Sequence, residues 1–384
     1  MLKERIEEYK RGGEKIEALK SLIWRLAEEL GHIKIMNFCG THEWTVVHYG
    51  IRSLMPDNVE LIAGPGCPVC ITPSYAIEKA IELSLEGVKV YTYGDAYRLP
   101  SLKPVKGVRS LFEAKASGGK VDVVYSFLDA VKEARNERGE KLFFGIGFET
   151  TAPSYALSFC KGIVPEDFYF LSVLRLTPPA ADYALSKVGK VSGIIAPGHV
   201  STITGAKPWR EIARNHSMPV VISGFEPLDV LISIATILKM IKEGKSGLVI
   251  EYRRAVREDG NKLARTYIEK VFEVSDAAWR GIGIIPSSGL ELTMKFSEYD
   301  AYKRFSIKKP EAKEWVSDLP KGCKCAEITL GLAKPVDCPY YLKSCTPDRP
   351  IGPCMVSSEG TCAIWARFGG GGLAEEIAKE VGVA

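Results

Sequence analysis

The chain has 384 residues, 46% of them hydrophobic and 26% charged, and a formal net charge of +4. These values are typical of a folded globular protein with two or three domains, and they exclude a disordered chain. The small net charge does not by itself indicate whether the protein binds nucleic acid. No basic stripe interleaved with aromatic residues occurs, however, so we expect no nucleic-acid partner.

No segment has the pattern of a signal peptide or a membrane span. Residues 1–15 are highly charged and lack an apolar core. The most apolar stretch, residues 230–241, is too short to cross a bilayer and contains Lys239. We therefore expect a cytoplasmic protein with no membrane partner. In that compartment cysteines more often bind metal or act in redox chemistry than form static bridges.

The predicted elements begin with a helix over residues 1–31. From residue 34, short β-branched or aromatic runs alternate with amphipathic stretches. The predicted strands are 34–38, 59–63, 88–93, 121–125, 142–146, 168–174, 193–196, 220–223 and 248–252. This alternation indicates parallel sheets with helices on both faces.

The strand-end turns of the two halves of the chain resemble each other in order and composition. We therefore predict an α/β fold with two similar doubly wound parallel-sheet domains, formed by residues 32–137 and 138–245. Residues 1–31 and 246–384 are expected to form a third domain. Its segment 321–368 is rich in Cys, Pro and Gly, a composition that favours a cluster or staples over an apolar core.

The ten cysteines fall into two separated groups. Cys39, Cys67 and Cys70 lie in the first fifth of the chain. Six more lie in the last sixth, and these are Cys323, Cys325, Cys338, Cys345, Cys354 and Cys362. Cys160 stands apart, and we expect it to be a small buried side chain. Two separated groups of cysteines predict two separate sites, one that holds a metal cluster and one that is reactive.

The sequence CGTHE, residues 39–43, directly follows a predicted strand. Thr41 can cap the helix that follows, which places Cys39 at the carboxyl edge of a sheet, where ligands bind. The positive end of the helix dipole is expected to lower the pKa of the Cys39 thiol. His42 and Glu43 can transfer a proton or hydrogen-bond a bound group. The alternative to a functional site is a buried structural cysteine beside a histidine whose hydrogen bonds are made within the protein.

The sequence GPGCPVC, residues 64–70, also follows a strand. Its C-x-x-C spacing is used by thioredoxin-type redox pairs and by metal knuckles. Cys67 and Cys70 can therefore close a disulfide or clamp one metal. No second C-x-x-C completes a tetrahedral zinc site. A metal bound by these two thiols and Cys39 keeps an open coordination position, which suits a working site.

Two further turns carry polar side chains at predicted strand ends. Glu149 lies in GFETT, residues 147–151, and His199 lies in PGHV, residues 197–200. Each signal is weak by itself, because a threonine with a nearby glutamate is common at helix starts. We expect both side chains to face the Cys39 site across an interdomain cleft.

The cysteines of the tail are too many for chance burial in a cytosolic protein. Four thiolates suit a [4Fe-4S] cluster, and they also satisfy structural zinc. The spacing does not separate these alternatives. Cys323 and Cys325 are too close in sequence for both to ligate the same iron easily, so one of them is expected beside the cluster.

Together, CGTHE, GPGCPVC, GFETTAP, PGHV and the Cys-rich tail resemble, in this order, the hydrogenase maturation factor HypD family over nearly the whole chain. The resemblance implies an accessory factor for [NiFe] hydrogenases that forms a scaffold with the small chaperone HypC. On that scaffold an iron ion receives two cyanides and one carbon monoxide as transient cargo. HypE is the implied cyanide donor, and the cargo passes through HypC to the hydrogenase large subunit. The family's two α/β domains and [4Fe-4S] domain agree with the predicted organisation.

Carried over to this sequence, the resemblance assigns roles to the first group of cysteines. The Cys39 thiolate is implied to help hold the iron. Cys67 and Cys70 are implied to be a redox-active dithiol or additional iron ligands. His42 and Glu43 are implied either to support the residues that hold the iron or to handle protons.

The tail is similar to the cluster region of ferredoxin:thioredoxin reductase, in which a cluster lies beside a disulfide. By that similarity, Cys325 and Cys354 form the disulfide. The implied cluster ligands are Cys323, Cys338, Cys345 and Cys362.

Two other functions remain open. One is a stand-alone thiol–disulfide oxidoreductase of the ferredoxin:thioredoxin reductase type, which leaves CGTHE unexplained. The other is a structural zinc protein with a binding role. We expect an accessory maturation protein with redox-active cysteines rather than a conventional turnover enzyme.

Overall fold

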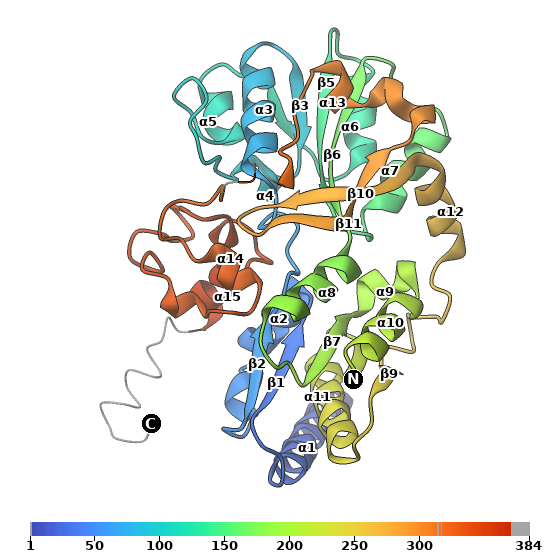
Figure 1. The fold of residues 1–384 in the computed structure, drawn as a ribbon, viewed down its shortest axis with the longest axis vertical. Coiled ribbons are helices and arrows are strands. Elements are labelled where there is room, and N and C mark those ends of the chain that lie inside the picture. The colour runs from blue at the N-terminus through green and yellow to red at the C-terminus, as the bar shows by residue number, and fades with distance from the viewer. Residues whose placement is uncertain (1, 313–314, 316, 370–384) are drawn as a thin grey trace.

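The structure is a computed structural model that describes residues 2–312, 315 and 317–369. Two α/β halves are stacked along the long axis, and the Cys-rich region lies beside their junction (Figure 1). One half contains a five-stranded sheet and the other a six-stranded sheet. Among the described residues, no helix is long and apolar enough to cross a membrane.

The five-stranded sheet is parallel throughout. Its strands, in spatial order, are β2 (Val59–Ala63), β1 (Ile33–Asn37), β7 (Gly193–Pro197), β8 (Pro219–Ser223) and β9 (Gly247–Ile250). One face is covered by α1 (Leu2–Ala27), α2 (Gly40–His48) and α11 (Pro227–Lys242). The other face is covered by α8 (Thr177–Lys187) and α10 (Lys207–Asn215).

The six-stranded sheet is parallel except for a hairpin at one edge. Its strands, in spatial order, are β10 (Phe272–Trp279), β11 (Gly283–Leu292), β6 (Phe168–Arg175), β5 (Lys141–Gly147), β3 (Lys89–Thr92) and β4 (Val121–Val123). One face is covered by α3 (Ser74–Leu85) and α5 (Leu111–Ala116). The other is covered by α6 (Phe127–Ala134) and α7 (Ala152–Cys160).

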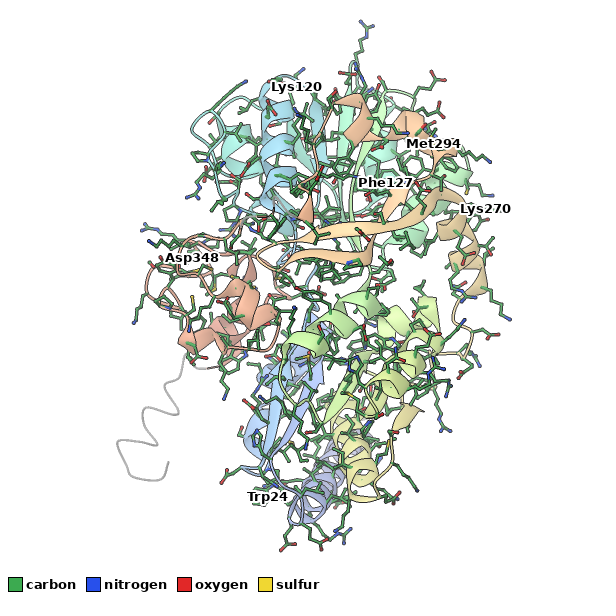
Figure 2. All side chains as sticks on the ribbon, in the orientation of Figure 1. Trp24, Lys120, Phe127, Lys270, Met294 and Asp348 are labelled. Atoms are coloured by element: carbon green, nitrogen blue, oxygen red, sulfur yellow. A yellow bond between two sulfur atoms is a disulfide. The ribbon has the colours of Figure 1, made fainter. Side chains whose placement is uncertain are left out.

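The central strands are buried on both faces, which explains why their sequences are mostly apolar. Every residue of β5 is buried, so its sequence KLFFGIG shows no alternation of apolar and polar positions. Phe127 of α6, labelled in Figure 2, lies in the six-stranded half. Its ring packs edge-on against that of Phe143 of this strand, with ring centroids 4.8 Å apart. Aromatic side chains thus fill the space between the sheet and its helices.

The remaining elements are short. They are α4 (Gly94–Tyr97), α9 (Gly198–Thr204), α12 (Lys262–Val271), α13 (Ala301–Arg304), α14 (Cys325–Thr329), α15 (Thr361–Phe368) and the 3-10 turns η1 (Ile51–Leu54), η2 (Met294–Tyr299), η4 (Pro335–Asp337) and η5 (Pro353–Met355). The tail around α14 and α15 consists mainly of loops. It packs against the core of the six-stranded half.

The predicted fold class is confirmed, and all nine predicted strands are present within two residues as β1–β9. The hairpin of β10 and β11 was not predicted. Its second strand contains Pro286, Ser287 and Ser288, and the ladder is interrupted by a bulge, so the alternation typical of a strand is obscured.

The predicted domain boundaries do not coincide with the two sheets. The chain leaves the five-stranded sheet after β2, builds β3 to β6 in the other sheet, and then returns with β7. Residues 32–137 and 138–245 therefore each contribute strands to both sheets. The reason is that β1 takes β7 as its second parallel neighbour, a pairing over 158 residues that leaves no local trace in the sequence.

The predicted third domain is also divided. Helix α1 packs on α11, β9 belongs to the five-stranded sheet, and β10 and β11 extend the six-stranded sheet. Only the segment from about residue 319 to 369 forms the Cys-rich region. Residues 370–384 of that prediction lie outside the described part.

Candidate functional site

A cavity of about 560 Å³ lies between the two sheets, where the carboxyl ends of their strands meet. The ends of β1 and β7 contribute from the five-stranded sheet, and those of β3 and β5 from the six-stranded sheet. Its polar lining includes Cys39, Tyr93, Asp95, Thr151, His199 and Glu359. Parallel sheets bind ligands at this edge, and here two such edges enclose one space.

Cys39 lies in the wall of this cavity. It is the N-cap residue of α2, has an extended backbone and is partly exposed. The helix begins at Gly40 without a side-chain cap, so Thr41 is not the predicted cap. Gly40 N donates to Gly66 O at 3.1 Å, which joins CGTHE to GPGCPVC. A Cβ at Gly66 would lie 2.6 Å from Cα of Cys39, so only glycine permits this approach.

The Cys39 thiol is protonated in the metal-free chain. Burial, followed by the nearby Glu359 carboxylate, raises its pKa to about 11. The expected net lowering of this pKa is therefore wrong: backbone N–H groups of Thr41 and His42 at the start of α2 do lower it, but desolvation of the thiolate outweighs them.

Glu359 is a site residue that the sequence analysis missed. Burial and the charge of Asp95 raise its pKa to about 7. A Cβ at Gly40 would lie 2.5 Å from Cβ of Glu359, so Glu359 packs directly on the CGTHE turn. Asp95 accepts a hydrogen bond of 2.7 Å from Ser357 Oγ. Glu359 thus lies beside Cys39, and Asp95 lies near Glu359 in the lining of the same cavity. No motif in the sequence marks either of them.

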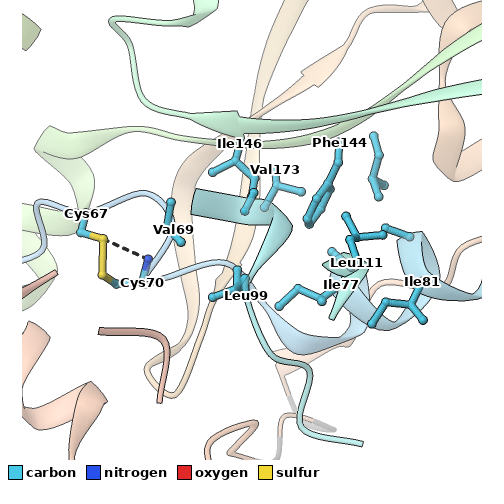
Figure 3. Packing of buried hydrophobic residues seen from close by; sticks show 14 of the residues in the cluster. Cys67, Val69, Cys70, Ile77, Ile81, Leu99, Leu111, Phe144, Ile146 and Val173 are labelled. Carbon is cyan, nitrogen blue, oxygen red and sulfur yellow. Dashed lines mark hydrogen bonds between the residues drawn. A yellow bond between two sulfur atoms is a disulfide. The ribbon is translucent and has the colours of Figure 1, made fainter. Parts of the chain in front are cut away.

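Cys67 and Cys70 form a disulfide, and Cys70 N donates to Cys67 Sγ at 3.1 Å (Figure 3). In this form neither sulfur can bind iron, so the predicted three-sulfur site with Cys39 is not assembled here. A narrow second cavity is nevertheless lined by Cys39, Cys67, Cys70 and Cys354. The first cysteine group therefore adjoins the tail.

His42 and His199 both stack on Phe225. The ring centroids of His42 and Phe225 are 4.5 Å apart, and those of His199 and Phe225 are 3.9 Å apart. His199 lines the cavity as predicted. His42 is fully buried and donates from Nε2 to Gly224 O at 2.8 Å. Burial lowers the pKa of His42 to about 4, so the ring is neutral and positions the turn instead of handling protons.

Glu43 is a structural anchor that lies in the wall of the narrow cavity and does not line the large one. It is 1% exposed and accepts hydrogen bonds from Arg52 Nη2, Asn37 Nδ2 and Trp365 Nε1. Because these donors occupy both carboxylate oxygens, Glu43 has no free position for a bound group. The predicted proton-handling role does not fit this geometry.

Glu149 lies behind the cavity wall. It is buried and accepts hydrogen bonds from Thr177 N at 2.7 Å and Thr177 Oγ1 at 2.9 Å. Burial raises its pKa to about 7. The predicted position facing Cys39 is therefore wrong. Glu149 instead holds the start of α8, whose Thr177 does line the cavity.

The six tail cysteines are unpaired thiols, and all except Cys323 are buried. Cys325 Sγ lies within hydrogen-bond reach of the thiols of Cys323, Cys354 and Cys362. We call these four residues the tail thiol group. The structure thus brings Cys325 and Cys354 together, as predicted, but without the predicted disulfide.

The other two predicted cluster ligands lie outside the tail thiol group. Cys345 Sγ accepts a hydrogen bond from Ile351 N at 3.3 Å, and Cys338 is buried. Within residues 2–312, 315 and 317–369, no three His, Cys, Asp or Glu side chains are grouped as a metal site. A set of buried thiols in mutual contact is nevertheless the donor chemistry that an iron–sulfur cluster requires.

Comparison with known proteins identifies the family. The HypD family model, described as "Hydrogenase formation hypA family", matches residues 14–369. The chain belongs to the HypD family. This match includes every cysteine and every site residue described above.

Similar proteins of the HypD family carry names from hydrogenase maturation. The "Hydrogenase maturation factor HypD" of Cupriavidus necator is 38% identical over 376 residues, covering 95% of this chain and 97% of the relative. That of Rhizobium leguminosarum bv. viciae is 39% identical over 374 residues, covering 94% of each. A Methanocaldococcus jannaschii protein named for hydrogenase expression and formation is 42% identical over 347 residues, covering 90% of this chain and 94% of the relative.

Proposed function

We propose that this HypD family protein holds an iron ion, as cargo of [NiFe] hydrogenase maturation, on the Cys39 thiolate. One observation carries the proposal: Cys39 is a free thiol that lines both the large cavity and the narrow cavity leading to Cys67, Cys70 and Cys354. It is therefore the residue at which a bound metal meets the other sulfurs.

The coordination chemistry calls for a partner. A thiolate is a soft donor suited to iron that carries cyanide and carbon monoxide. One sulfur leaves further positions on the iron open, and the Cys67–Cys70 disulfide does not supply them in this form. A cavity of about 560 Å³ is within the range of small-molecule sites and leaves room beside the iron. We assign the remaining donor to the chaperone HypC.

The proposed sequence of events takes place in the cytoplasm. The protein and HypC form the scaffold, HypE supplies cyanide, and the iron with two cyanides and one carbon monoxide passes through HypC to the hydrogenase large subunit. A bound cation displaces the proton of the Cys39 thiol despite its raised pKa, since a coordinating thiol is deprotonated by its metal.

The tail is proposed to hold a [4Fe-4S] cluster, which supplies single electrons when bound. The proposed ligands remain Cys323, Cys338, Cys345 and Cys362. Support comes from the buried tail thiols and from the shared core that joins them to Cys67 and Cys70. The contacts of Cys325 with Cys323 and Cys362 make Cys325 the first residue to test as an alternative ligand.

Thiol–disulfide exchange can link the two cysteine groups. Thiolate attack by Cys354 on the Cys67–Cys70 disulfide forms a mixed disulfide, which Cys325 then resolves. The products are a Cys325–Cys354 disulfide and the Cys67 and Cys70 thiols, so two thiols are consumed and two are released. The narrow cavity that Cys354 shares with Cys67 and Cys70 supports this route.

The test is infrared spectroscopy of the protein isolated with HypC. Cys39→Ala is expected to lose the cyanide and carbonyl stretching bands, while Cys160→Ala, which changes a distant free cysteine, retains them. Full-intensity bands in the Cys39→Ala complex would overturn the proposal.

A stand-alone thiol–disulfide oxidoreductase is the second candidate, and the Cys67–Cys70 disulfide favours it. It predicts reduction of a protein disulfide without HypC and with Cys39→Ala as active as the wild type. The two functions are thus separated by the same variant.

A further inference from the structure

A further cavity, of about 260 Å³, lies where the hairpin of β10 and β11 meets strand β6, and we call it the hairpin cavity. Its walls come from the end of β6, both strands of the hairpin, the start of α3, helix α13 and residues 309–312. Among the described residues, none that lines it also lines the large cavity or the narrow one. The function proposed above makes no use of it.

A break in the hairpin ladder opens this space. The register of β10 against β11 shifts between Ser275 and Ala277, and such bulges re-aim the side chains beside them. Gly289 lies opposite the bulge, where a Cβ would be 2.7 Å from Cβ of Ala277 and 3.1 Å from Oγ of Ser275. All three residues line the hairpin cavity, so glycine at position 289 keeps it from being filled.

A buried cation lines the hairpin cavity. Arg175 is the last residue of β6 and is only 3% exposed. Its Nε and Nη2 donate to Ala278 O at 3.0 and 2.7 Å, and its Nη1 donates to Leu174 O at 2.9 Å. These bonds use three of the five N–H groups of a guanidinium, and the other two, on Nη1 and Nη2, lie beside the hydroxyl of Tyr75. The acceptors are neutral carbonyl oxygens, so they do not balance the charge.

The side chains around Arg175 leave one positive charge over. Burial raises the pKa of the Tyr75 and Tyr302 hydroxyls, so both are neutral. The carboxylate whose charge acts on Arg175 is that of Glu291, and its Oε1 is paired with Lys309 Nζ at 2.6 Å. Two cations thus share one anion at this end of the hairpin cavity.

Two further carboxylates, of Asp276 and Glu311, line the hairpin cavity from its exposed side. Asp276 accepts a hydrogen bond from Ser287 N at 2.9 Å. Because both side chains are exposed, water and salt screen their charges from the buried guanidinium.

The hairpin cavity also contains a hydroxyl without a partner. Oγ of Ser275 is buried and, within the part of the chain that the structure describes, makes no hydrogen bond. A buried hydroxyl in this state costs free energy, which a bound acceptor would recover. An arginine with N–H groups to spare and an unused hydroxyl thus line the same small space.

We propose that the hairpin cavity binds a small organic monocarboxylate, whose carboxylate accepts from Arg175 and Ser275 and whose body lies against Tyr75 and Tyr302. One uncompensated positive charge matches a monoanion, whereas a phosphate dianion would bring a surplus negative charge into the site. The volume of about 260 Å³ lies below the usual range for drug-sized ligands, so the ligand has roughly ten non-hydrogen atoms or fewer.

The first test compares three probes of similar shape by isothermal titration calorimetry on the metal-free protein. Benzoate is expected to bind with a Kd on the order of 1 mM. Benzamide keeps the ring but has no charge, and phenyl phosphate is a dianion at about pH 8. Each is expected to bind at least tenfold more weakly than benzoate. No benzoate binding, or equal affinity for either of the other probes, would overturn the proposal.

Ser275→Ala is the sharpest variant, because the hydroxyl it removes has no partner in the free protein. The unfolding midpoint is expected to stay the same or rise, while benzoate affinity falls about fivefold. Ser154→Ala, at an exposed position outside the hairpin cavity, is the control and should change neither. Wild-type benzoate affinity in Ser275→Ala would exclude this hydroxyl from the site.

Arg175→Gln removes the charge. It is expected to lower benzoate affinity at least tenfold and to leave the affinity for benzamide little changed. If the loss of the bonds to Ala278 and Leu174 prevents folding, the comparison of benzoate with benzamide on the wild type carries the same information. A folded Arg175→Gln protein that still prefers benzoate to benzamide as the wild type does would overturn the proposal.

Hydrogen–deuterium exchange locates the bound probe. Benzoate is expected to protect peptides that cover the end of β6 and the hairpin, residues 168–175 and 272–292, and to leave the turn at Cys39 unchanged. The same protection is expected in Cys39→Ala, because this site does not depend on the iron. Protection at the large cavity alone would place benzoate there and contradict the proposal.

Discussion

Oε1 of Glu43 accepts a hydrogen bond of 2.7 Å from Nε1 of Trp365, a residue 322 positions further along the chain. The guanidinium of Arg52 bonds the same carboxylate and lies 5.0 Å from the centroid of the Trp365 ring. This contact fastens helix α15 of the Cys-rich region to helix α2, whose N-cap residue is Cys39. Glu43 of the CGTHE motif was expected to handle protons or to bind a group at the site. It instead fixes the position of the tail relative to the cavity.

Glu43→Gln is therefore expected to lower the free energy of unfolding by about 2 kcal/mol, because it leaves Arg52 without its buried counter-charge. The tail should also become more sensitive to limited proteolysis. Chemical denaturation and mass mapping of the fragments measure both effects. Glu269→Gln, which changes an exposed glutamate, is the control. Equal stability of the two variants would refute the anchoring role.

Gly66→Ala is expected to push the GPGCPVC loop away from Cys39. The new Cβ would lie 2.6–2.7 Å from three backbone atoms of Cys39, and a backbone cannot yield as a flexible side chain does. We expect a loss of about 1–3 kcal/mol in stability and loss of iron retention in the complex with HypC.

Gly94→Ala is the matched control for this change, since Gly94 lines the same cavity. There the new Cβ would meet only a methyl group of Val123 at 3.9 Å, which is an ordinary contact. Thermal unfolding and iron content of both variants make the comparison. A Gly66→Ala protein that matches Gly94→Ala in both measurements would show that the close approach is unimportant.

Alkylation of Cys39 by iodoacetamide should be slow at neutral pH in the metal-free protein. With a pKa of about 11, the reactive thiolate is a small fraction, and the rate should rise about tenfold per pH unit between pH 7 and 10. Glu359→Gln removes a nearby negative charge and should increase the rate severalfold. That increase should be largest above pH 7, where Glu359 is ionised.

Peptide mass mapping assigns the reaction to Cys39 and separates it from the other free thiols. Glu258→Gln, at an exposed position outside the cavity, is the control. Unchanged alkylation in Glu359→Gln at pH 8–9 would exclude the carboxylate as a cause of the raised thiol pKa.

Glu149 should make the protein less stable as pH rises. Its folded pKa of about 7 exceeds the ordinary value of 4.5, so the folded state keeps a proton that the unfolded state has lost. Stability is then highest below pH 4.5 for this group and falls until pH 7, by about 3 kcal/mol in total. Glu149→Gln should remove this fall between pH 5 and 8, and Glu166→Gln, at an exposed position, should retain it. Denaturant titrations at several pH values provide the measurement.

Several site residues could be predicted because their signals are local. Cys39, Cys67 and His199 follow strands that the sequence shows clearly, and parallel strands present their carboxyl ends at one edge. The roles of His42, Glu43 and Glu149 could not be predicted, since they depend on burial. Each is a polar side chain whose neighbours come from distant segments: Gly224, Trp365 and Thr177.

The sequence by itself determined the nine parallel strands, the α/β class and the division of the cysteines into two groups, because periodicity and spacing are properties of neighbouring residues. Only the tertiary structure decided which strand joins which sheet, and that Cys354 of the tail shares a narrow cavity with Cys39, Cys67 and Cys70. It also placed Glu359 beside Cys39. The physical reason is that strand partners, desolvation and the compensation of buried charge arise from contacts over hundreds of residues, for which a linear pattern carries no signal.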